Sequence, residues 1–126
     1  AKDKLENATI ALENQAFGDG TYHAYSSFVI AAKALLLSID VKCNTQINII
    51  NDFQTHFVEK GIFSFETDFV HHVLRFKKTT PTEDFAQNYW NEANDFFQKV
   101  LAYRTVQIAE AKAAADKLVI DQYYNA

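Results

Sequence analysis

Few residues in this sequence are of the kinds that interrupt regular structure. The 126 residues include three glycines and one proline. A many-stranded sandwich or barrel needs such turn residues at roughly every eight to twelve positions, so the composition disfavours an all-β fold and favours helices. With 48% hydrophobic residues, the chain is expected to form one domain, residues 1–126, around one core.

Cysteine and long apolar runs are also scarce. The single cysteine, Cys43, cannot form an internal disulfide, and no stretch has the pattern of a signal peptide. The most apolar stretch, Phe28 to Leu37, is about ten residues long and contains Lys33, which makes it about half as long as a bilayer span. We therefore expect a cytoplasmic protein with a core helix in this stretch and no association with a membrane.

Positive charge is in deficit. The chain has 12 Lys and Arg residues against 16 Asp and Glu residues, a formal net charge of −4. This is the wrong sign for unspecific binding to phosphate backbones. A general nucleic-acid binder is therefore disfavoured.

Apolar residues recur at helical spacing along almost the whole chain. The first two predicted helices span Lys2–Phe17 and Thr21–Ser38, and Gly18-Asp19-Gly20 is expected to end the first. Apolar residues cover well over half of the circumference of the second. It should therefore be the most buried helix.

Capping residues predict where the later helices begin. Asn44 is expected to cap a third helix that ends at Gly61, and Ser64 to cap a fourth helix with Phe65 on its apolar stripe. The segment Thr80–Glu83 has the pattern of a capping box, in which its first threonine is the cap and proline takes the first helical position. A fifth helix should begin there.

The fifth helix is predicted to be unusually long. No glycine or proline follows Pro81, and roughly forty helical residues would extend about 60 Å. A small bundle is shorter than this, so the helix end, Ile108 to Leu118, should overhang the core or pack on another chain. The predicted fold is all-α: an up-and-down four-helix bundle with an extra helix that is short or overhangs.

Apolar residues near the end of the sequence predict self-association. Leu118, Val119, Ile120, Tyr123 and Tyr124 have few local partners on an overhanging helix. Left exposed, they would form an aggregation-prone patch. We therefore expect a homodimer with a two-fold interface.

The sequence lacks the patterns of a metal site and of an activated nucleophile. A di-iron bundle needs two Glu-x-x-His pairs, and none occurs, because Asp68 and His71 form only a single weaker match. Neither Lys42 nor Asn44 could act as a base for Cys43. We expect no metal, no cofactor and a structural role for the cysteine.

The best candidate for chemistry is a basic cluster near residue 75. Arg75 follows His71 by four residues and His72 by three, so a helix could present it beside either one. An arginine that holds phosphate and a histidine that acts as general base could cleave RNA without a metal. The alternative is a cationic helix end, Arg75, Lys77 and Lys78, that complements the macrodipole. These three residues are also the candidates for binding a nucleotide or RNA.

Two stretches of the sequence are recognisable together. Residues 22–37 read YHAYSSFVIAAKALLL, and residues 53–61 read FQTHFVEKG. They resemble the HEPN family of small helical bundles, and the resemblance extends over about Leu5 to Tyr103. It implies an up-and-down four-helix bundle that is often dimeric. Members are metal-independent ribonucleases of toxin–antitoxin and defence systems, or companions of minimal nucleotidyltransferases.

The resemblance also indicates whether the chain is catalytic. Active members of the family carry an arginine, commonly followed by asparagine, with a histidine a few residues beyond it, and these meet across a dimer interface. Arg75 matches that arginine, but Phe76 follows it and residues 77–84 contain no histidine. The chain therefore looks like a non-catalytic branch of the family that serves in binding and dimerisation.

Other interpretations stay open. The chain could be a ribonuclease that pairs Arg75 with His71, His72 or His56, or the partner of a nucleotidyltransferase in a toxin–antitoxin pair. It could also be an accessory domain of a larger protein, such as a sulfite or nitrite reductase, and the absence of methionine favours this origin. Cys43 alone cannot hold an iron–sulfur cluster, so redox chemistry would reside elsewhere in that protein.

Overall fold

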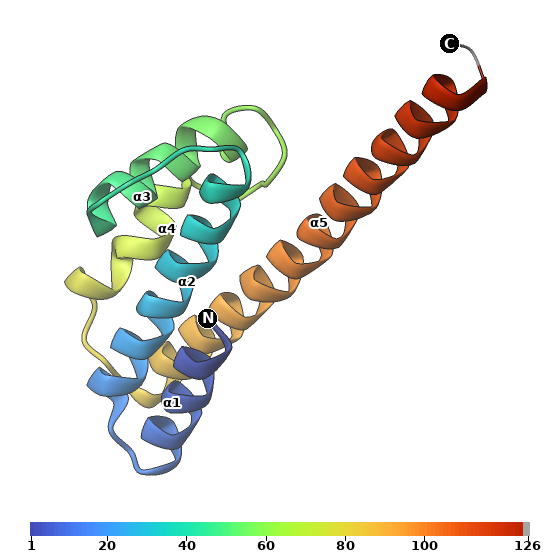
Figure 1. Ribbon diagram of the computed structural model, residues 1–126. Helices are drawn as coiled ribbons and strands as arrows, with labels where there is room; N and C mark the ends of the chain where they lie inside the picture. The colour runs from blue at the N-terminus through green and yellow to red at the C-terminus, as the bar shows by residue number, and fades with distance from the viewer. Residues whose placement is uncertain (125–126) are drawn as a thin grey trace.

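The protein is built from helices. The computed structural model describes the backbone of residues 1–124 and the side chains of residues 1–119. Within that range it contains no strand, and none of its helices is both long and apolar enough to cross a lipid bilayer. The expectation of an all-α fold is confirmed. The elements in chain order are α1 (Lys2–Glu13), α2 (Phe17–Ser38), α3 (Gln46–Phe53), a π-helical turn (Gln54–Val58), α4 (Phe69–Leu74), a 3₁₀ turn (Arg75–Lys78) and α5 (Glu83–Tyr124) (Figure 1).

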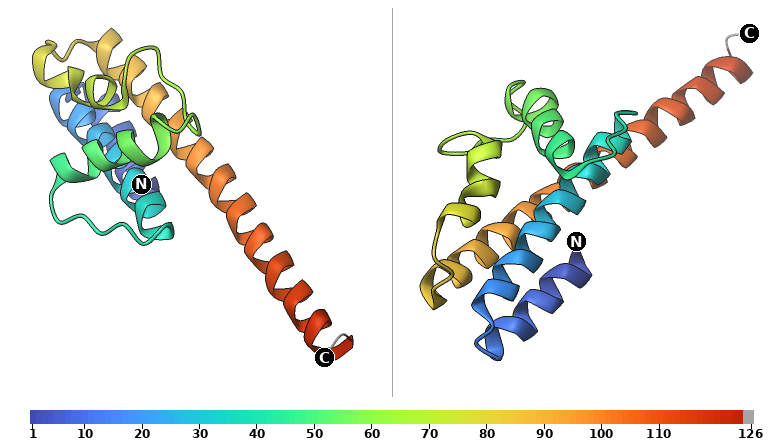
Figure 2. Two further views of the ribbon diagram at one scale, coloured as in Figure 1. Left: turned by 90° about the horizontal axis from the view of Figure 1, so that it is seen from above. Right: turned by 90° about the vertical axis from the view of Figure 1, so that its left-hand side faces the viewer.

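Helix α2 lies at the centre of the fold. It contacts α1, α3, α4 and α5, and the views of Figure 2 show α1 and the first half of α5 beside it with α3 and α4 on its other side. Twelve of its 22 residues are buried. The prediction that this would be the most buried helix is confirmed.

A cluster of aromatic rings joins the helices. The ring of Phe53 on α3 is fully buried and lies 4.5 Å from Phe69 of α4 and 5.3 Å from Phe96 of α5, measured between centroids. Phe28 of α2 lies 5.5 Å from Phe96 and 5.4 Å from Tyr89. Since aromatic rings bury large apolar areas and prefer these separations, the same rings fix the positions of α2, α3, α4 and α5.

The first turn differs from its prediction. The segment Gly18-Asp19-Gly20 was predicted to end the first helix. It lies instead in the first turn of α2. The chain reverses before it, with Gln15 in the left-handed region at φ 61°. A Cβ atom at Gly20 would lie 2.9 Å from Cδ2 of Leu12, so this glycine permits the close approach of α1 and α2 rather than a turn.

Two predicted caps were wrong by one or two residues. Thr45, not Asn44, caps α3, and its side chain accepts a hydrogen bond from the Asn48 amide (3.2 Å). Thr82, not Thr80, accepts from the Phe85 amide at the start of α5 (3.2 Å). In each pair, two residues one or two positions apart can cap a helix, and the backbone conformation decides between them.

The largest error concerns α4. Asp68, not Ser64, caps this helix and accepts from the His71 amide (2.7 Å). Phe65 therefore lies in the loop before α4 and not on its apolar stripe. The predicted end of the third helix at Gly61 is three residues late, because the helical segment ends at Val58, and Gly61 (φ +78°) lies in the turn that follows.

Helix α5 extends far beyond the core. Val100 is its last buried residue among those whose side chains are described, and Figure 1 shows the rest of the helix projecting into open space. Leu118 and Val119 are 60% and 50% exposed. The predicted overhang is confirmed. The side chains of Ile120, Tyr123 and Tyr124, which also entered the prediction of self-association, lie outside the described residues.

The aromatic cluster makes Phe53 the residue on which folding should depend most. Truncation to alanine, Phe53→Ala, is expected to lower the free energy of unfolding by about 3–5 kcal/mol, measured by urea denaturation. Tyr22→Ala removes a ring that is 53% exposed and serves as the matched control, with an expected change of about 0.5 kcal/mol or less. Equal losses in both variants would contradict the assignment of the core.

Candidate functional site

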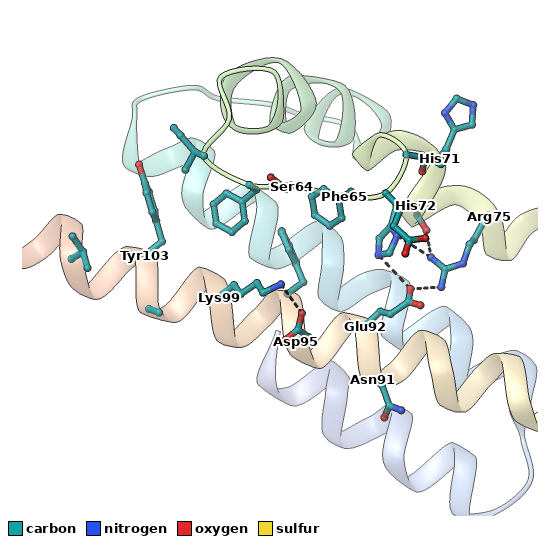
Figure 3. Close-up of a pocket in the computed structure, with 17 residues that line it drawn as sticks. Ser64, Phe65, His71, His72, Arg75, Asn91, Glu92, Asp95, Lys99 and Tyr103 are labelled. Atoms are coloured by element: carbon teal, nitrogen blue, oxygen red, sulfur yellow. Dashed lines mark hydrogen bonds and ion pairs between the residues drawn. The ribbon is translucent and has the colours of Figure 1, made fainter.

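An open groove of about 1270 Å³ lies between the loop before α4, helix α4 and the outer side of α5. Its sides combine aromatic rings with charged groups (Figure 3). The aromatic residues are Phe63, Phe65, Phe96 and Tyr103, and the ionisable ones are Glu66, His71, His72, Arg75, Glu92, Asp95 and Lys99. The groove has room for a ligand that has both apolar and polar groups.

Arg75 begins the 3₁₀ turn that continues α4, and both terminal nitrogens of its guanidinium group make hydrogen bonds within the chain. Nη2 donates a hydrogen bond to the Glu92 carboxylate, and Nη1 donates to the backbone oxygen of His72 (2.9 Å). The guanidinium carbon also lies 5.2 Å from the centroid of the Tyr89 ring and 5.6 Å from that of Phe85. Paired with a carboxylate and placed against two rings, the arginine is held by its own chain.

His72 completes a triad with Arg75 and Glu92. Its Nδ1 lies 3.2 Å from Nη1 of Arg75, and its Nε2 lies 3.3 Å from Oε2 of Glu92. Burial lowers the pKa of His72, and the Arg75 charge adds to this effect, while Glu92 and Glu66 oppose it. The imidazole is therefore neutral at pH 7. Because a guanidinium can only donate, we assign Nδ1 as the acceptor from Arg75 and Nε2–H as the donor to Glu92.

This hydrogen bonding limits what the triad can do. A general base needs a free lone pair, and the lone pair of neutral His72 already accepts from Arg75. A phosphate-binding arginine needs an uncompensated charge, and the Glu92 carboxylate already compensates it. As it stands, the arrangement is that of a structural ion pair between α4 and α5.

The sequence did not predict Glu92. Its partner in the triad is 17 residues away, on another helix, and no local spacing rule relates two such positions. One signal was present: Glu92 follows Tyr89 by three residues and precedes Phe96 by four, so it had to lie beside the apolar face of α5.

The other candidate residues are distributed over different places. His71 also lines the groove, but its Nδ1 lies 2.8 Å from Oδ1 of Asp68, the side chain is 78% exposed, and Figure 3 shows its ring pointing away from Arg75. His56 lies in the π-helical turn, outside the groove lining. Lys77 and Lys78 are exposed and also outside the lining, and Lys77 Nζ lies 5.9 Å from the Tyr25 ring centroid.

Cys43 has the properties of a structural residue. Its thiol is buried and donates a hydrogen bond to Oδ2 of Asp52 (3.0 Å). This bond and burial raise the pKa of the thiol to about 11. The thiol therefore stays protonated at pH 7 and is a poor nucleophile.

Residues 1–119, whose side chains are described, hold no group of three or more His, Cys, Asp or Glu residues placed to bind a metal ion. Comparisons of the chain with protein-family models, with curated proteins and with solved structures find no match. The HEPN-like assignment is therefore a proposal.

The lowered pKa of His72 predicts a pH dependence of stability. The unfolded chain binds a proton at the ordinary histidine pKa of 6.5, and the folded chain binds it only at lower pH. Stability should therefore fall as the pH decreases below 6.5. His72→Gln should reduce this slope by up to about 1.4 kcal/mol per pH unit, measured by urea denaturation between about pH 7 and pH 5.

The control for this experiment is Lys78→Gln, which removes an exposed charge from the same segment and leaves His72 in place. It should retain the wild-type slope. If His72→Gln also retains it, then the folded protein protonates His72 as readily as the unfolded chain does, and the triad assignment is wrong.

Proposed function

We propose that this chain is a HEPN-like up-and-down four-helix bundle that acts as a non-catalytic binding and dimerisation module. The observation that carries the proposal is the Glu92 carboxylate on Arg75. In a metal-free ribonuclease the guanidinium group would hold a phosphate oxygen, and here a carboxylate of the same chain takes that place.

Two further features support this proposal. The sequence has no histidine between Lys77 and Asp84, so it lacks the second catalytic residue that the HEPN resemblance would require. The short connections between α1 and α2 and between α4 and α5 suit an up-and-down bundle. The partner of such a module would be a protein: a second copy, a nucleotidyltransferase, or a covalently linked enzyme such as a sulfite or nitrite reductase.

A metal-independent ribonuclease is the second candidate, and one observation favours it. Arg75 and His72 lie 3.2 Å apart and both line the open groove. A substrate phosphate would have to displace Glu92 from Arg75, and Nη1 of Arg75 would also have to leave Nδ1 of His72 before that lone pair could accept a proton. His72 is better placed for this role than His71 or His56, because neither of them contacts Arg75.

The proposal is tested by incubating the purified protein with single-stranded and structured RNA. We expect no cleavage by the wild type. Arg75→Ala should lower the stability by about 1 kcal/mol, since the Arg75–Glu92 pair is partly exposed and screened by solvent. Cleavage is followed by gel electrophoresis and stability by urea denaturation.

His56→Ala serves as the control, because it removes a histidine outside the groove. Cleavage that is lost in Arg75→Ala and in His72→Ala but kept in His56→Ala would establish the ribonuclease. The non-catalytic proposal would then be overturned.

A further inference from the structure

The overhang of α5 continues the helix face on which α1 packs. Trp90 points to α1, since its Nε1 donates to the backbone oxygen of Leu5 (3.2 Å). At about 100° per residue, Leu101, Ile108 and Val119 all lie within about 20° of the direction of Trp90. Helix α1 does not cover them: they are 47%, 55% and 50% exposed.

The residues of this face are spaced as in a coiled coil. Leu101, Ile108 and Ala115 recur every seven residues, and Ala111 and Leu118 each follow by three. Apolar residues at these intervals form the seam along which two helices pack. We call these five residues the α5 seam. It runs for about 27 Å at 1.5 Å per residue.

We propose that the α5 seam binds the same seam of a second copy of this chain, in antiparallel orientation. The inference deepens the proposed function and rests on it, because it names the partner of the binding module. Two arguments support a second copy in this orientation: the charges along the seam, and the position of α1.

The charges complement one another when the helices run antiparallel. Arg104 is the charged residue that interrupts the α5 seam. In a parallel pair in register, it would face the partner's Arg104, a repulsive contact. With the two-fold axis between Ala109 and Glu110, Leu101 instead lies opposite the partner's Leu118. Arg104 then lies beside the partner's Asp116, and the symmetry repeats this ion pair.

The position of α1 also favours the antiparallel arrangement. Figure 2 shows that α1 runs antiparallel to the first half of α5, and Leu5 of α1 accepts the hydrogen bond from Trp90 of α5. A parallel partner would bring two copies of α1 into the same space. An antiparallel partner helix would instead pack further along α5, and it would run in the same direction as α1 does beside Trp90.

The test is the mass of the protein in solution, measured by sedimentation equilibrium over about 1 µM to 1 mM. A seam of this length is smaller than a standard interface, so this range should include the dissociation constant. We expect a reversible monomer–dimer equilibrium. Ile108→Glu should weaken the dimer by at least roughly tenfold, because it places two unpaired charges in the seam.

Val106→Glu is the matched control. Val106 is 53% exposed, close to the 55% of Ile108, but it points to the opposite side of α5, about 200° away. It should leave the dissociation constant unchanged. A monomer at every concentration, or equal effects of the two variants, would overturn the inference, as would a wild-type complex that forms only with another protein or with lipid vesicles.

The orientation is tested with a charge exchange. Arg104→Asp and Asp116→Arg should each weaken the dimer by roughly two- to fivefold, and the double variant should restore it. If the single variants weaken the dimer and the double variant does not restore it, the antiparallel register is overturned.

Self-association and RNA cleavage are separate measurements. A monomer that does not cleave RNA overturns only the dimer, and a dimer that cleaves RNA overturns only the non-catalytic role.

Discussion

The packing of buried aromatic rings is the constraint on which the rest of this structure depends. Helices α3 and α4 have eight and six residues, which is too short for a helix to be stable by itself in water. Phe53 and Phe69 attach these two helices to each other and to Phe96 of α5. The positions of the loop and the 3₁₀ turn that line the groove depend on how these two helices are packed. The groove therefore depends on the packing of the aromatic core, and a loss of this packing would also disrupt the groove.

The triad of His72, Arg75 and Glu92 shows how little separates a structural pair from a catalytic one. The residue types and the groove would suit acid–base chemistry on a phosphate ester. What differs is the position of one carboxylate, which lies where a substrate anion would bind and compensates the arginine charge. The same carboxylate ties α5 to the end of α4. Its contribution to stability is limited by its exposure, so its main effect is on the chemistry of the site.

The long, strongly periodic helices could be predicted from the sequence, and the local details could not. The patterns of α2 and α5 follow from many apolar residues, so one misjudged position does not change the result. A cap depends on one side chain, and Asn44 and Thr45, or Thr80 and Thr82, compete for it. The assignment of Ser64 as a cap failed because Phe65 packs against Phe69 and Phe96 from the loop, a tertiary contact. Glu92 was missed for the same reason: its partners come from another helix.

The absence of glycine and proline from α5 has a consequence for its length. An uninterrupted helix transmits rotation as well as distance, so inserting one residue near Val100 would turn everything beyond it by about 100° and advance it by about 1.5 Å. An insertion of seven residues would turn it by only about 20° and keep the same face in place. A change in the length of α5 therefore matters mainly through the rotation that it causes, and less through the distance that it adds. Variation in its length should come in steps of whole heptads.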